Sequence, residues 1–543
     1  MADLRYNVWK GWESRMISIK NLSVAFCGKQ VVNNVTFDIK PHEIIGIVGE
    51  SGSGKSVTAL TIMGLLSANA DITSGEVIFN DTVLMRSGEK PDESLLRSFR
   101  GNHMSMVFQE PMTSFNPTQK IGKQLSEALK INTSLKKDEI KDKVIECFKD
   151  VGLRDPEHVF DSYPHQLSGG MRQRAMIAMS VILEPELIIA DEPTTALDVT
   201  VQSQIVKLLK KINQEHRTSI LFITHDLNLA REICDRIIVM KDGVIRESGD
   251  AQEIFNHPED SYTRMLIEKV PSRTKKKSNV QSIQTAKSED EYILSVKNLN
   301  VFYDQGSNSL FTKSRKKKQV INDISFNIKR SEILGLVGES GCGKTTLSKA
   351  ILGINTYYTG EISLNCNNRP QMIFQDPYSS LNPAKTIGWL LEEPLRALGA
   401  RDHSKKMSGD ELKQEAIDIL KKVGLDETYY NRRPSQLSGG QRQRISIGQA
   451  VITKPELIIA DEPVSALDVT IQAQIMELML KLQEEMHLAY LFISHDINVV
   501  YQMSNRIMVM KEGRIIESGD TQEVFDNPKE SYTKQLLLAE SQY

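Results

Sequence analysis

The chain has 543 residues, of which 40% are hydrophobic and 25% are charged, and its formal net charge is −3. This composition is ordinary for a globular protein, and the length is enough for roughly three to four domain-sized units. The near-neutral charge argues against a globally basic nucleic-acid-binding protein, so we expect no nucleic-acid partner. The sequence contains no apolar run of membrane-spanning length, and its first 15 residues are too polar for a secretory signal.

Residues 1–15 match neither of the two sequence repeats described below, so we predict an N-terminal extension there, with either Met1 or Met16 as the true start. The five cysteines are scattered and form no CxxC pair. Neither a zinc site nor a disulfide framework is therefore indicated, and the pattern fits a reducing, cytoplasmic setting.

The first conspicuous element is an apolar segment, residues 44–48, followed by GESGSGKS and a helix-like segment at 57–65. A strand, a glycine-rich turn and a helix in this order predict a phosphate-binding P-loop. Glycines let the backbone approach the phosphates, Lys55 supplies a charge to them, and the Ser56 hydroxyl is a ligand for Mg²⁺. The predicted nucleotide-binding residues are Gly49, Glu50, Ser51, Gly52, Ser53, Gly54, Lys55 and Ser56.

Further along, a buried-strand pattern at 187–190 ends in Asp191 and Glu192. We interpret Asp191 as a Mg²⁺ ligand acting through water, and Glu192 as the general base for the attacking water. Gln109, which ends the segment MSMVFQ, is placed to sense Mg²⁺ or that water, and His225 is placed to contact the γ-phosphate and orient the water. Taken singly, an acidic turn, a packed histidine and a solvated glutamine are the simpler interpretations.

The sequence LSGG before the helical segment MRQRAMIAMS is a second phosphate-binding candidate, contributed by Ser168, Gly169 and Gly170. A serine helix cap is the simpler interpretation. One unit does not need two phosphate cradles around one γ-phosphate, whereas two units facing head to tail do.

The whole pattern occurs twice, which predicts a duplicated domain. We expect domains at 16–270 and 292–543, joined by a polar linker at 271–291. The first copy carries more sequence between its P-loop and Gln109, including 81–103, and the equivalent stretch before Gln375 is much shorter. The second copy has an inserted loop at 306–318. Even the ends correspond, as SYTRMLI and SYTKQLL. The second set of site residues is Gly338, Glu339, Ser340, Gly341, Cys342, Gly343, Lys344, Thr345, Gln375, Ser438, Gly439, Gly440, Gln441, Asp461, Glu462 and His495.

The expected fold is α/β: two tandem P-loop NTPase domains, each with an antiparallel β subdomain and a helical subdomain. Hairpin-like strands precede each P-loop. Glu- and Lys-rich helical patterns, for example at 140–151 and 412–423, follow Gln109 and Gln375.

In their order, these motifs resemble those of the ATP-binding-cassette (ABC) ATPases, including the family's ALD loops at 196–198 and 466–468. The resemblance implies that ATP is sandwiched between the P-loop of one copy and the LSGG loop of the other. Ser438 to Gln441 would then complete the first site, and Ser168 to Met171 the second, where Met171 replaces the usual Gln or Glu. Phe26 and Tyr303 occupy the positions where this family stacks adenine, although ordinary strand aromatics are the alternative.

The segments FQEPMTSFNP, FQDPYSSLNP and HPEDSYTRMLIEKVP resemble the dipeptide, oligopeptide and nickel importer ATPases, here in fused tandem form. This implies an ATPase that drives uptake of peptides or a related solute at the cytoplasmic face of the bacterial inner membrane. The implied partners are two permease subunits, contacted through the helical segments, and a solute-binding protein. The cofactors are ATP and Mg²⁺. No cysteine follows Cys366, so we expect no iron–sulfur cluster.

Two alternatives remain open at this stage. Ribosome-associated tandem ABC ATPases carry a long, charged helical linker, unlike the short linker here. Fused sugar importer ATPases commonly have one degenerate site, whereas both sites here keep their Lys, Glu and His. The substrate itself is determined by the permease and the binding protein.

Overall fold

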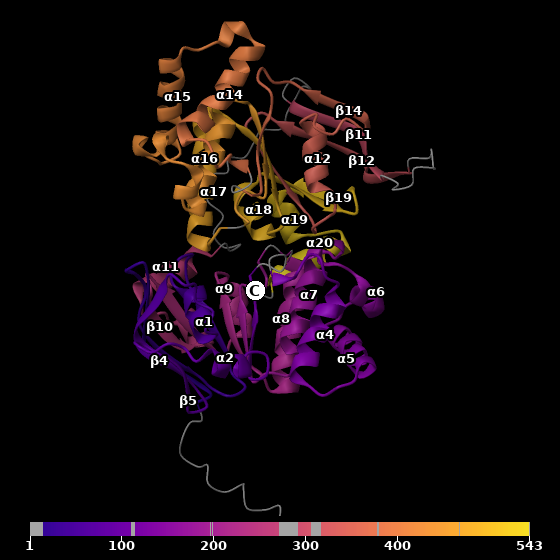
Figure 1. The fold of residues 1–543 in the computed structure, drawn as a ribbon. Helices are drawn as coiled ribbons and strands as arrows, with labels where there is room; N and C mark the ends of the chain where they lie inside the picture. The colour runs from indigo at the N-terminus through magenta and orange to yellow at the C-terminus, as the bar shows by residue number, and fades with distance from the viewer. Residues whose placement is uncertain are drawn as a thin grey trace, which may run out of the picture. The chain divides into compact units, whose positions relative to one another are not determined.

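The structure is a computed structural model that describes residues 15–109, 114–195, 197, 199–270, 292–305, 316–376, 380–465 and 467–541. The chain divides into two compact units: the first consists mainly of residues up to Val270, and the second mainly of residues after it (Figure 1). Among the described helices, none combines the length and the apolar character needed to cross a bilayer.

The centre of the first unit is a six-stranded sheet in the order β10-β9-β3-β8-β7-β6. Its strands are β3 (Ile44–Val48), β6 (Met104–Val107), β7 (Leu187–Asp191), β8 (Ser219–Thr224), β9 (Arg236–Lys241) and β10 (Val244–Asp250). All pairs are parallel except β9 with β10. All five residues of β3 and of β7 are buried, because a parallel sheet covered on both faces needs continuous apolar strands.

A second, antiparallel sheet of the first unit has the order β2-β1-β4-β5. It consists of β1 (Ile17–Phe26), β2 (Lys29–Ile39), β4 (Ala70–Phe79) and β5 (Thr82–Arg86). Its core-facing side chains pack with one side of the central sheet in a single hydrophobic cluster. The additional segment 81–103 therefore has a structural role here: it contributes β5 and the helix α2 (Glu93–Phe99).

Helices complete the first unit. They are α1 (Lys55–Ile62), α4 (Ile121–Asn132), α5 (Lys137–Asp150), α6 (Pro156–Asp161), α7 (Gly169–Val181), α8 (Val199–His216), α9 (Leu227–Ile233), α10 (Ala251–Asn256) and α11 (Ser261–Lys269). The helix α5 is amphipathic, with Ile140, Val144 and Phe148 buried at helical spacing. In Figure 1, α4 to α6 lie beside α7, on the opposite side of this unit from β4 and β5.

The second unit repeats this plan. Its central sheet has the order β15-β16-β17-β13-β18-β19, from β13 (Ile333–Val337), β15 (Gln371–Ile373), β16 (Leu457–Asp461), β17 (Ala489–Ser494), β18 (Arg506–Lys511) and β19 (Arg514–Asp520). Its antiparallel sheet has three strands, β11 (Tyr292–Gln305), β12 (Lys316–Lys329) and β14 (Tyr358–Leu364). The helices are α12 (Lys344–Ile351), α14 (Ile387–Arg401), α15 (Gly409–Lys422), α16 (Gly439–Val451), α17 (Val469–Met486), α18 (Ile497–Met503), α19 (Thr521–Asp526) and α20 (Ser531–Ser541).

The predicted α/β class, with an antiparallel sheet and a helical part in each unit, is confirmed. Two predicted boundaries are wrong, that of the helix after the first P-loop and that of the inserted loop in the second unit. The helix after the first P-loop begins at Lys55 rather than at residue 57 and ends at Ile62, because the helix start itself forms part of the phosphate cradle. The predicted loop at 306–318 is too long, since the Cα register pairs Lys316, Lys317 and Lys318 with the end of β11. Cross-strand pairing outweighs the local charge repulsion there.

Candidate functional site

The first P-loop is organised around the ammonium group of Lys55. Its Nζ donates to the main-chain oxygens of Gly49 and Glu50, at 2.7 and 2.8 Å. The N-cap of α1 is Gly54, which has no side chain to cap the helix. A buried cation beside a helix N-terminus is a site for an anion such as a phosphate.

The second P-loop has the same geometry. Lys344 Nζ donates to the main-chain oxygens of Gly338 and Glu339, at 2.6 and 3.0 Å. Both lysines are almost fully buried. In both units, therefore, loop carbonyls hold the lysine charge at the position where the motif predicts phosphate.

A hydroxyl and a carboxylate meet beside each loop. Ser56 Oγ donates to Asp191 Oδ1 at 3.0 Å, and Thr345 Oγ1 donates to Asp461 Oδ2 at 2.9 Å. Burial raises the pKa of Asp191 to about 6, although the hydrogen bond from Ser56 opposes it. The pKa of Asp461 is raised for the same reason. Two hard oxygen donors next to a phosphate site fit a Mg²⁺ ion, which takes few protein ligands and keeps the rest for water and substrate.

Three side chains converge on one oxygen of Glu192. Its Oε2 accepts from Gln109 Nε2 at 2.9 Å and from Thr195 Oγ1 at 2.9 Å, and it lies 3.2 Å from His225 Nδ1. Glu192 has a φ of 47°, in the left-handed region that a non-glycine residue rarely adopts. Such strained residues cluster at functional sites.

The ionisation of Glu192 and that of His225 depend on each other. Burial raises the pKa of Glu192, but the hydrogen bond and charge of His225 outweigh it and lower the pKa to about 2. Burial lowers the pKa of His225, but Glu192 outweighs it and raises the pKa above its ordinary value. The carboxylate is thus ionised, and the imidazolium is favoured.

The second unit holds Glu462 in nearly the same way. Its Oε2 accepts from Gln375 Nε2 at 2.8 Å and lies 3.1 Å from His495 Nδ1. Its φ is 50°, and its pKa is lowered against the effect of burial. One contact differs, because Ser465 Oγ donates to the main-chain oxygen of Glu462, at 3.2 Å. Sequence reasoning overlooked this difference, although PTTALD against PVSALD marks it.

The LSGG serines cap the helices that follow them. Ser168 Oγ accepts from Met171 N at 3.3 Å, and Ser438 Oγ accepts from Gln441 N at 3.4 Å. Ser438 N in turn donates to Gln441 Oε1 at 3.0 Å, which completes a capping box that Met171 cannot make. The capping interpretation is therefore observed, and the phosphate role of these loops, with Gly169, Gly170, Gly439 and Gly440, stays a prediction.

The remaining predicted residues are placed as follows. Phe26 is half-buried at the end of β1, and Tyr303, in β11, is 39% exposed. Asp468 caps α17, accepting from Ile471 N at 3.0 Å. Ala196, Asp198, Ala466, residues 1–14, the linker at 271–291 and parts of the two FQ segments lie outside the described residues.

Within each unit, the sheet order explains why the distant motifs meet. The strands β6, β7, β8 and β3 are neighbours, and their carboxyl ends carry Gln109, the Asp191–Glu192 pair, His225 and the P-loop. In an open parallel sheet, ligands bind at this edge. A P-loop, a buried carboxylate pair and a histidine at one sheet edge define the class: a P-loop ATPase.

Comparison with known proteins identifies the family. The ABC transporter family matches residues 32–195 and 321–465. The oligopeptide/dipeptide transporter C-terminal region matches residues 246–293. The chain therefore belongs to the ABC transporter family, as an ATP-binding subunit of the oligopeptide/dipeptide importer type.

Full-length relatives agree with this assignment. The chain is 40% identical to the peptidoglycan transport ATP-binding protein YejF of Agrobacterium fabrum, over 96% of each chain. It is 39% identical to the glutathione import ATP-binding protein GsiA of Salmonella typhimurium, over 96% of this chain and 89% of that one. ATP hydrolysis coupled to import is accordingly the activity of this chain.

A solved archaeal ribosome recycling factor has a similar fold, with a TM-score of 0.58 over 91% of this chain and 88% of that chain. Its sequence identity of 22% shows a shared fold alone. It does not favour the translation-factor alternative over import.

Proposed function

We propose that this chain hydrolyses ATP with Mg²⁺ to drive the uptake of small peptides or peptide-bearing solutes through two separate permease subunits. A solute-binding protein would deliver the solute to these permeases. The cargoes in the names of the two relatives, glutathione and peptidoglycan, are peptides or carry them. The observation that supports the proposal most is that each unit keeps the full set of lysine, hydroxyl, carboxylate pair, glutamine and histidine in hydrogen-bonded contact. The chain would act at the cytoplasmic face of the inner membrane.

The present contacts indicate how the residues act in hydrolysis. Lys55 would exchange the Gly49 and Glu50 carbonyls for phosphate oxygens, and Ser56 with Asp191 would hold Mg²⁺. When Gln109 and His225 turn from Glu192 toward the phosphate and the attacking water, Glu192 loses the cation that depresses its pKa. Its carboxylate then becomes a stronger base. It accepts the proton of the water as the oxygen forms its bond to the γ-phosphorus and ADP leaves.

The two units would cooperate. We propose domains at 16–270 and 292–543, a linker at 271–291, and two composite sites in which each P-loop faces the LSGG loop of the other unit. Ser168 and Ser438 cap exposed helix starts, and such a start binds an anion. Because both sites keep their glutamate and histidine, both would hydrolyse ATP.

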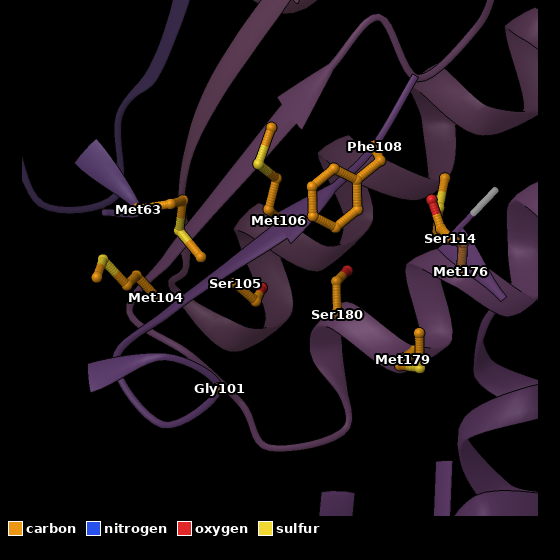
Figure 2. Close-up of a pocket in the computed structure, with 10 residues that line it drawn as sticks. All are labelled: Met63, Gly101, Met104, Ser105, Met106, Phe108, Ser114, Met176, Met179 and Ser180. Atoms are coloured by element: carbon orange, nitrogen blue, oxygen red, sulfur yellow. The ribbon is translucent and has the colours of Figure 1, made fainter. Parts of the chain in front are cut away.

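One permease contact would lie at a pocket of about 180 Å³ in the first unit. Figure 2 shows Met63, Met104 and Met106 on one side of the Phe108 ring, and Met176 and Met179 on the other. Flexible methionines adapt to an inserted apolar side chain. Phe108 directly precedes Gln109, whose side chain reaches Glu192 at 2.9 Å. A side chain bound in this pocket would therefore contact Phe108, the neighbour in sequence of the residue that contacts Glu192.

The second unit presents a different surface at the corresponding positions. Gln449 replaces Met179 in the repeat, and Ser446 replaces Met176. Phe374, the counterpart of Phe108, is 47% exposed, and Trp389 is 37% exposed. We infer that the two units bind two non-identical permease subunits.

The test is reconstitution of the chain with candidate permeases and a binding protein in lipid vesicles. We expect ATP hydrolysis that rises when peptide-loaded binding protein is present, together with uptake of that peptide. The variant Met179→Glu should lose one permease during purification, whereas Leu538→Glu, at an exposed apolar position of the second unit, should keep both. Stable binding to ribosomes with no permease binding would contradict the proposal.

A further inference from the structure

Each unit places a tyrosine of its C-terminal helix against its own P-loop. Tyr262 of α11 accepts a hydrogen bond at its hydroxyl oxygen from Glu50 N, at 3.3 Å. Tyr532 of α20 accepts from Glu339 N at 3.2 Å. Both tyrosines are 6% exposed. These are the tyrosines of the repeated SYT segments, to which the mechanism above assigns no role, and Tyr262 lies in the region matched by the oligopeptide/dipeptide transporter family.

The tyrosine is itself held firmly. In the first unit, Asp260 caps α11, with Oδ1 accepting from Tyr262 N at 2.9 Å. The carboxylate of Glu247, on β10, accepts from the main-chain N–H groups of Glu259 and Asp260, at 2.9 and 3.2 Å. Lys241 Nζ lies 4.5 Å from the centre of the Tyr262 ring, a favourable cation–π contact.

The second unit repeats two of these supports. Glu517 accepts from the main-chain N–H groups of Lys529 and Glu530, at 2.8 and 3.1 Å. Lys511 Nζ lies 4.7 Å from the centre of the Tyr532 ring. Since the two units have diverged elsewhere, the preservation of this arrangement in both indicates a shared role.

Each P-loop makes a second hydrogen bond with the C-terminal part of its own unit. The turn between β9 and β10 donates from Gly243 N to the main-chain oxygen of Ser53, at 3.1 Å. In the second unit, Gly513 N donates to the main-chain oxygen of Cys342, at 2.9 Å. The first P-loop is therefore held at two points, by Tyr262 and by Gly243, which lie 212 and 190 positions after the residues that they contact.

The tyrosine contact falls on a residue that the lysine also uses. The N–H of Glu50 donates to Tyr262, while its carbonyl accepts from Lys55 at 2.8 Å. If Lys55 turns to a phosphate, it releases this carbonyl, and the tyrosine hydroxyl keeps its hold on the same residue. The loop would then retain its shape whether or not a nucleotide is bound.

We propose that Tyr262 and Tyr532 are positioning residues that pre-form the P-loop for ATP, so that the C-terminal segment of each unit sets its nucleotide affinity. This inference rests on the proposed function, since it assumes ATP at each P-loop. Neither hydroxyl is assigned to the reacting atoms. Their loss should therefore change the binding of ATP and leave the chemical step intact.

The test replaces each hydroxyl while keeping the ring, with Tyr262→Phe, Tyr532→Phe and the double variant. Affinity is measured by calorimetric titration of the full chain with a non-hydrolysable ATP analogue and Mg²⁺, and KM and kcat are measured with ATP. Losing one neutral hydrogen bond should raise the dissociation constant and KM about threefold to tenfold at the affected site, with kcat within about twofold. Each single variant should show one weakened and one normal class of site.

The matched control is Tyr490→Phe. Tyr490 is fully buried, and its hydroxyl donates to the main-chain oxygen of Met479 at 3.5 Å, a long hydrogen bond. It lies near the start of β17, at the opposite end of the strand from His495. This variant should leave the dissociation constant within about twofold of the wild type, well below the effect of a lost hydrogen bond.

Three outcomes would overturn the inference. The first is an unchanged affinity in the double variant, and the second is a lowered melting temperature with unchanged affinity, which would indicate a structural role alone. The third is a fall in kcat with an unchanged KM. Failure of the wild-type chain to bind the analogue would instead overturn the proposed function, so the two failures are distinguishable.

Discussion

Two glycines of the first P-loop should respond very differently to alanine. A Cβ added at Gly49 would lie 2.1 Å from the main-chain oxygen of Met240, at the end of β9. A Cβ added at Gly52 would meet nothing within 4 Å, although the φ of +83° there is left-handed. The first substitution thus creates a collision with backbone, and the second creates only conformational strain.

The expected magnitudes follow from these contacts. Gly52→Ala should cost about 1 kcal/mol of unfolding free energy, because the left-handed conformation costs about 1–2 kcal/mol and the less flexible unfolded chain returns part of it. Gly49→Ala should cost more than about 3 kcal/mol, since no rotamer change can relieve a clash with a carbonyl and β9 must shift. The loop should then also lose affinity for nucleotide.

The second unit supplies an independent replicate. A Cβ added at Gly338 would lie 2.2 Å from the main-chain oxygen of Met510. A Cβ added at Gly341, where φ is +82°, would meet nothing within 4 Å. The assay is urea unfolding of the four variants, comparing the midpoint of the transition of the altered unit, because a two-unit chain need not unfold in one step. Equal midpoints for Gly49→Ala and Gly52→Ala, and for their counterparts, would refute the packing of the C-terminal strands against the P-loop.

The remaining predictions concern catalysis, metal and stability. The double variant His225→Ala, His495→Ala should lower kcat on the order of 100-fold with little change in ATP affinity, and an unchanged kcat would contradict the role of the histidines. Chelation of divalent ions should abolish hydrolysis without changing the circular dichroism spectrum, and added Mg²⁺ should restore it; hydrolysis that persists in excess chelator would rule out the metal. Arg506→Met should destabilise the second unit by about 3 kcal/mol in urea unfolding, because Glu332, 1% exposed and 3.0 Å from that guanidinium, would lose its charge partner. An unchanged midpoint would show that the ion pair is not needed.

The sequence predicted the chemistry at the sheet edge because each motif carries its own local signal. One buried strand ends in Asp191 and Glu192, and another ends before His225. Once these strands are parallel neighbours in one sheet, the side chains at their ends lie close together. The class of fold and the family followed from the order of these motifs. The catalytic roles themselves remain predictions, since the structure shows contacts among the residues rather than turnover.

What could not be predicted depends on long-range or fine geometry. The contact of Tyr262 with Glu50 joins positions 212 residues apart, and no periodicity connects them. The different hydroxyl contacts of Thr195 and Ser465 depend on side-chain orientation, which the motif does not specify. The start of β12 at Lys316 depends on cross-strand pairing with β11, which overrides the local signal of a basic loop.

The most direct test of the account is ATP turnover by the double variant Glu192→Gln, Glu462→Gln. Glutamine keeps the size and the hydrogen-bonding shape of the side chain but cannot accept the proton of the attacking water. We predict that the purified variant binds ATP with Mg²⁺ as tightly as the wild type and releases no phosphate above background. Phosphate release at the wild-type rate would contradict the assignment of these two glutamates, and with it the mechanism derived from the site.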